Sequence, residues 1–98
     1  MRIVYHPDAE KELIEAAQFY ERSVANLGGQ FLDGADQAIG AILKAPERWR
    51  ILDGDVRRYL MPRFPYAIYY RVLPDEVRIL AFKHHGRHPD YWRYRQSE

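Results

Sequence analysis

The side chains best suited to acid–base or anion chemistry are concentrated near the end of the sequence. The segment from Phe82 to Arg95 contains three histidines, three arginines, a lysine, two tyrosines and a tryptophan. Cleavage of RNA without a metal needs a group that accepts the 2′-hydroxyl proton, a cation that stabilises the crowded phosphate, and a donor to the leaving oxygen. Histidine suits the proton transfers and arginine suits the phosphate. The candidate cations are Arg57, Arg63, Arg71 and Arg87.

Catalysis is nevertheless only one hypothesis for these residues. The chain has fifteen lysines and arginines against fourteen acidic residues, so many of its arginines can form ion pairs or solvated faces. Residue types without a defined geometry are weak evidence for an active site. Whether the protein is an enzyme therefore stays open at this point.

The histidines also suggest a metal site, but their spacing argues against one. His84 and His85 are adjacent, so on a strand their side chains point to opposite faces. Gly86 and Pro89 interrupt any helix that would bring His84 and His88 onto one face. Cysteine is absent, and no second cluster of ligands occurs elsewhere. We therefore expect no metal and no other cofactor.

The aromatic residues have two alternative roles. Trp49, Trp92, Tyr91 and Tyr94 could stack on nucleic-acid bases. A tryptophan near a chain end more commonly buries its large apolar ring, so we expect Trp92 to anchor the C-terminal segment against the core.

Length, composition and charge limit the classes of protein. The 98 residues suit a single domain, residues 1–98, and the absence of cysteine fits a reducing cytosol. Charged residues among the first twenty argue against a secretory or membrane-spanning segment. The net charge of +1 combines four basic and eight acidic residues in 1–47 with eleven basic and six acidic residues in 48–98. The basic half either meets an anionic partner or is partly neutralised by the acidic half.

The order of predicted elements gives an α+β fold. Alternation predicts a strand over 2–6, apolar spacing predicts helices from Pro7 to the glycine pair at 28–29 and over 30–44, and β-rich alternation predicts the last three strands. Those strands are expected over 55–61, 66–72 and 76–84. We therefore predict a two-layer β-α-α-β-β-β domain, with a helical hairpin on one face of a small, mostly antiparallel sheet.

Alternation along 66–72 separates core-facing from exposed side chains. Tyr66, Ile68, Tyr70 and Val72 are expected to face the helices. Ala67, Tyr69 and Arg71 are expected on the other face, which has no helix left to cover it. Exposed tyrosine and arginine on an open sheet are typical of a binding surface.

The stretch VRRYLMPRFPYAIYYRVLPDEVRILAFKHHGRHPDYW, from Val56 to Trp92, resembles the RelE/ParE family of toxins from bacterial type II toxin–antitoxin systems. The earlier pattern P.AE.EL.EA..FY and the proline after the second helix extend the resemblance over almost the whole chain. It is closer to the ParE, or plasmid-stabilisation, branch. The resemblance implies a small cytoplasmic protein that arrests growth and is neutralised by a cognate antitoxin, with which it forms a hetero-oligomer.

Within the family, three functions are open. ParE-type members act on DNA gyrase, RelE-type members cleave mRNA on the ribosome without a metal, and a member without toxicity would remain an antitoxin-binding module. Resemblance to the nuclease branch assigns Arg57, Arg58 and Arg87 as catalytic cations and Tyr91 as a loose match for the later tyrosine. Ala67 stands where that branch has an arginine, which favours gyrase inhibition. The residues expected to contact antitoxin or target are Arg57, Arg63, Tyr69, Arg71 and Arg87.

Overall fold

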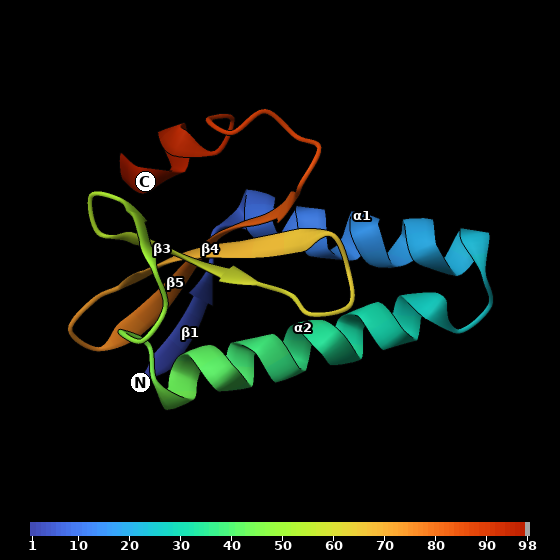
Figure 1. Cartoon of the computed structure of the whole chain (residues 1–98), viewed down its shortest axis with the longest axis horizontal. Coiled ribbons are helices and arrows are strands. Elements are labelled where there is room, and N and C mark those ends of the chain that lie inside the picture. Colours follow the sequence, from blue (N-terminus) through green and yellow to red (C-terminus); the bar gives the residue numbers. More distant parts are fainter. Residues whose placement is uncertain (98) are drawn as a thin grey trace.

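The computed structural model describes residues 1–97 and confirms the predicted α+β architecture (Figure 1). Two helices pack on one face of a five-stranded sheet with the order β1-β5-β4-β3-β2. β1 runs parallel to β5, and the other neighbouring strands are antiparallel. The elements are β1 (Arg2–Tyr5), α1 (Pro7–Ser23), α2 (Leu27–Lys44), β2 (Ile51–Asp53), β3 (Val56–Leu60), β4 (Tyr66–Val72), β5 (Glu76–His84) and a 3₁₀ helix, η1 (Arg93–Ser97).

The junction between the helices differs from the prediction. The glycine pair lies inside the first turn of α2, while α1 already ends at Ser23. The connection turns at Asn26, which has a left-handed φ of 72°. The Glu21 carboxylate accepts hydrogen bonds from the backbone N–H groups of Asn26 and Gly28 at 2.9 and 3.0 Å, so a side chain of α1 caps α2.

Gly28 is required by close helix packing and not by a helix end. A Cβ atom at this position would lie 2.5 Å from the carbonyl oxygen of Ala17, which is closer than real Cβ contacts allow. The glycine therefore allows the backbone of α2 to approach α1.

The face of the sheet toward the helices, here called the helix side, carries the larger core. Phe31 on α2 is fully buried, and its ring centroid lies 5.1 Å from that of Phe64 and 5.3 Å from that of Tyr20. Ile68 and Tyr70 of β4 belong to the same core, as the alternation predicted. This aromatic packing fixes the helical hairpin on the sheet.

A bulge in β5 changes which side chains reach the opposite face. Tyr69 is paired with Ala81, whereas the next residue, Tyr70, is paired with Ile79. Leu80 is therefore an extra residue, and both Leu80 and Ala81 pack away from the helices.

The opposite face of the sheet, here called the tail side, was expected to be partly open, and part of it is covered. The C-terminal segment, residues 85–97, returns across it, opposite α2 in Figure 1. Trp92 is fully buried there, and its ring centroid lies 4.9 Å from that of Tyr69. The anchoring role predicted for Trp92 is confirmed. The predicted exposure of Tyr69 is wrong, because the indole leaves it only 5% exposed.

No helix in the part of the chain that the structure describes is both long and apolar enough to cross a membrane.

Candidate functional site

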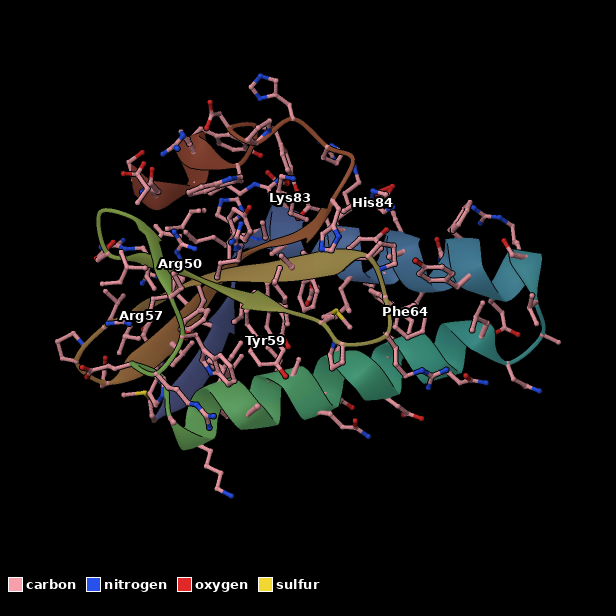
Figure 2. All side chains as sticks on the ribbon, in the orientation of Figure 1. Arg50, Arg57, Tyr59, Phe64, Lys83 and His84 are labelled. Carbon is pink, nitrogen blue, oxygen red and sulfur yellow. The ribbon has the colours of Figure 1, made fainter. Side chains whose placement is uncertain are left out.

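The two adjacent arginines of β3 lie on opposite faces of the sheet. Arg57 lies on the helix side and donates to the carbonyl oxygens of Glu47 and Trp49 at 2.9 and 2.8 Å. Arg58 lines a hollow on the tail side together with Lys83. Figure 2 shows the labelled Arg57 and Lys83 well apart. The two arginines predicted to act together on a phosphate therefore do not converge.

The predicted pair Arg87 and Tyr91 does lie together. The Arg87 guanidinium is 3.8 Å from the Tyr91 ring centroid and 3.8 Å from a Glu12 carboxylate oxygen. The Tyr91 hydroxyl donates to Glu12 Oε2 at 2.6 Å. Burial and this hydrogen bond to a carboxylate raise the pKa of Tyr91 above its usual range. The phenol is thus held as a donor to Glu12 and is poorly suited to act as a general base.

Glu12 of α1 is the centre of a polar network that joins this helix to β5 and to the C-terminal segment. Its Oε1 accepts from the Phe82 backbone N–H at 3.1 Å and from Arg95 at 2.8 Å. Arg95 is 4% exposed and also donates to the Leu80 carbonyl oxygen at 3.0 Å. Burial lowers the pKa of Arg95, but the bonds to Glu12 and Tyr94 outweigh it and raise the pKa overall. In the sequence, the one available indication of this role was that Glu12 is the glutamate of the EL pair in the pattern P.AE.EL.EA.

The remaining predicted contact residues lie on separate surfaces. Arg71 donates to both carboxylate oxygens of Asp55 at 2.9 to 3.1 Å, and these bonds lower the pKa of that carboxyl. Arg63 lies beside α2 and donates to Gln30 Oε1 at 3.1 Å. Tyr69 is buried beneath the indole and offers little surface to a partner. The structure therefore does not bring the five predicted contact residues into one site.

The two adjacent histidines diverge, as predicted from alternation. His84 lies against α1 in a hollow with Glu15 and Phe19, whereas His85 lines the tail-side hollow with Lys83. Among residues 1–97, no group of three or more His, Cys, Asp or Glu side chains could hold a metal ion.

A groove runs between α2 and the β3–β4 connection, and Figure 2 shows Tyr59 and Phe64 on this side of the sheet. Its volume is about 230 Å³. It combines apolar walls with amide and charged groups at its edges. The lining residues are Gln30, Asp33, Gly34, Gln37, Ala38, Tyr59, Met61, Pro62, Arg63 and Phe64. Such a groove suits an amphipathic segment of a partner protein.

Comparison with known proteins gives two findings. Residues 3–89 match a family model described as the ParE toxin of the type II toxin–antitoxin system parDE. A solved chain from the chromosomal ParDE TA system of P. aeruginosa has the same fold, with a TM-score of 0.62 and 17% identity. That likeness covers 86% of this chain and 95% of the solved chain. No curated protein matches this sequence significantly.

Proposed function

Because the chain belongs to the ParE toxin family of type II toxin–antitoxin systems, we propose that it arrests growth by binding and inhibiting DNA gyrase. We further propose that a cognate antitoxin, encoded beside it, neutralises this activity by forming a complex with it. The toxin acts in the cytoplasm, where both gyrase and the antitoxin are found.

One observation favours inhibition by binding over RNA cleavage: the divergence of the predicted nuclease groups. Arg57 and Arg58 point to opposite faces, and Ala67, at the position where the nuclease branch has an arginine, supplies no further cation. Tyr91 is engaged by Glu12. Cleavage would need an acid, a base and a cation around one phosphate. Binding to a large target makes no such demand on geometry.

The groove beside α2 supports antitoxin binding. Arg63 stands at its edge, 5.6 Å from the Phe64 ring centroid, so a cation and an apolar wall lie next to each other. An amphipathic segment with acidic and apolar residues would complement both. Removing the Arg63 charge should therefore weaken neutralisation more than toxicity.

The test is expression of the chain alone and together with the adjacent gene. We expect growth arrest from the chain alone, rescue by the adjacent gene, and loss of supercoiling by purified gyrase in the presence of the purified chain. Arg87→Ala removes a half-exposed cation of the C-terminal segment, and Arg22→Ala at the end of α1 is its matched control. Arg87→Ala should reduce arrest, whereas Arg22→Ala should not.

The alternatives give different results in the same experiments. The endonuclease would be established instead if gyrase supercoils DNA normally at a saturating concentration of the purified chain and primer extension detects codon-phased cuts in mRNA. Absence of growth arrest, with retained binding to the product of the adjacent gene, would establish a non-toxic antitoxin-binding module.

A further inference from the structure

The tail side of the sheet contains a hollow whose floor is a small residue. Ala67 of β4 is paired with Leu60 of β3 and with Lys83 of β5, so the three residues form one row across the sheet. The methyl group of Ala67 leaves space between its two larger neighbours. The cavity is about 290 Å³, and Arg58, Tyr69 and His85 complete its lining.

The hollow holds buried positive charge without a carboxylate to neutralise it. Lys83 is 7% exposed, and its ammonium group donates to the His84 carbonyl oxygen at 3.2 Å. Within residues 1–97, neither Lys83 nor Arg58 forms an ion pair with an acidic side chain. Burial lowers the pKa of Lys83, and the positive charges of Arg87 and Arg58 lower it further. An anion in this hollow would offset both the burial of the Lys83 charge and its repulsion by the two arginines.

An unpaired backbone edge lies beside the hollow. Within residues 1–97, the pairing of β3 on this edge extends from Val56 to Arg58, so the backbone of Leu60 at the end of the strand has no neighbour there. The Arg58 N–H points outward to the Arg50 carbonyl oxygen, and the Met61 N–H points inward to Tyr66. Because these directions alternate along an antiparallel strand, the N–H and C=O of Leu60 point to the free edge. The Leu60 side chain is 55% exposed.

We propose that this edge and hollow bind an extended, acidic segment of a partner protein. The segment pairs its backbone with Leu60, covers the exposed Leu60 side chain with an apolar residue, and places one carboxylate over Ala67 beside Lys83, Arg58 and His85. A protein segment is favoured over nucleic acid because the free edge and Leu60 match a peptide backbone and an apolar side chain. Charge alone would suit either partner.

The proposal does not depend on the gyrase target, because peptide binding can be measured on the isolated chain. The ¹⁵N-labelled full chain is titrated with an acetylated, amidated peptide in which valine and glutamate alternate over seven residues, followed by NMR. We expect saturable shifts at the amides of Leu60, Lys83 and His85. The same peptide with glutamine in place of glutamate should bind about thirtyfold more weakly, as loss of a buried charge pair implies.

Two variants and a control separate the charge from the space. Lys83→Met removes the buried cation and should weaken binding by a similar factor. Ala67→Leu fills the hollow and should abolish binding with every cation retained. Lys44→Met, an exposed cation at the end of α2, should change nothing. Circular dichroism shows whether each variant is folded.

Three outcomes would overturn the proposal. If folded Lys83→Met bound the glutamate peptide as tightly as the unmodified chain, the Lys83 cation would have no role in binding. If the glutamine peptide bound as tightly as the glutamate peptide, the carboxylate would have no role in binding. Tighter binding of a seven-nucleotide oligothymidylate, with shifts at the same amides, would assign the hollow to phosphate. If gyrase is unaffected while the peptide still binds, only the proposed toxic target fails.

Discussion

The two faces of the sheet are covered in different ways. On the helix side, two long helices cover an aromatic core centred on Phe31 and Phe64. On the tail side, a short segment buries one indole, Trp92, over a small patch, and charged side chains provide most of its other ties. These ties join Arg95 to Glu12, the Gln96 carbonyl to Arg71, Arg93 to Asp53, and Tyr94 to Asp8.

This difference indicates that the helix side determines global stability, whereas the tail side can open separately. Apolar burial contributes in proportion to area and is the dominant favourable term in folding. Of the tail-side ion pairs, Arg95–Glu12 is buried, whereas the pairs of Arg71 with Asp55 and Arg93 with Asp53 are exposed and contribute little each. Local openings are favoured where fewer apolar contacts are lost. Arg87, Lys83 and His85 all lie on or beside the separable face, so opening of the C-terminal segment would alter the surface available to a partner.

The largest expected effect comes from the helix side. Phe31→Ala removes a fully buried ring and should lower the free energy of unfolding by about 3–5 kcal/mol. Because the total stability of a domain is on the order of 5–15 kcal/mol, this variant should be close to unfolding. Urea denaturation followed by circular dichroism measures the change. Leu32→Ala, at the adjacent and exposed position, is the control and should differ little.

On the tail side, Glu12→Gln should release the C-terminal segment while the helices stay packed. It removes the negative charge that Arg95 and Tyr91 contact, at a local cost of about 2–3 kcal/mol. Hydrogen exchange should therefore accelerate at the amides of η1, with little change in α2. Glu15→Gln on the same helix is the control. Equal acceleration in α2 would show that the two sides open together, which would contradict the comparison.

The helix side was the more predictable of the two. Alternation along β4 places Ile68 and Tyr70 in the core, because period-two patterns describe a sheet with one buried face. The fold class follows from the order of such elements, and the resemblance of Val56–Trp92 identified the family that the match over 3–89 shows.

The tail side was less predictable, because its contacts join residues far apart in the chain. Glu12 and Arg95 are separated by 83 positions, and no local pattern pairs them. β2 is only three residues long, too short for alternation to be recognised. The bulge at Leu80 places two neighbouring residues on one face, which breaks the period. Tyr69 was placed on the correct face, but its contact with Trp92 was missed, because no local pattern pairs two residues this far apart in the chain.

Alkaline pH should weaken both sides, each through one tyrosine. Burial raises the pKa of Tyr70 from 10.0 to about 12. A raised pKa in the folded state favours the protonated phenol, so its contribution is complete below pH 10.0 and is lost as the pH rises toward 12. Between pH 10.0 and 12 the free energy of unfolding of Tyr70→Phe should therefore fall by roughly 2 kcal/mol less than that of the unmodified chain.

Tyr91 provides the matching test on the tail side, since its pKa is also raised. Urea denaturation across the same pH range, with absorbance of the ionised phenols, measures the effect of each variant. Tyr91→Phe should slow the alkaline release of η1 in hydrogen exchange, and Tyr70→Phe should not. If both variants change the two sides equally, the faces do not open independently.

The smallest expected effect concerns the exposed pair of Arg71 and Asp55. The Arg71 guanidinium donates to both carboxylate oxygens and also to the Gln96 carbonyl at 3.2 Å, so it links β4 to the C-terminal segment. Asp55 is largely exposed, and solvent screens the pair, so Asp55→Asn should lower the free energy of unfolding by only about 0.5 kcal/mol. The loss should appear as faster exchange near Gln96.

The pH dependence of this pair identifies its origin. Hydrogen bonds from Arg71 lower the pKa of Asp55, so its contribution is present at neutral pH and is lost as the pH falls through the lowered value. Asp55→Asn should lack this acid-dependent part, whereas Asp75→Asn in the β4–β5 turn should retain it. If Asp55→Asn accelerated hydrogen exchange in the C-terminal segment more than Glu12→Gln does, the segment would be held at its exposed end, and Glu12 would not be its main anchor.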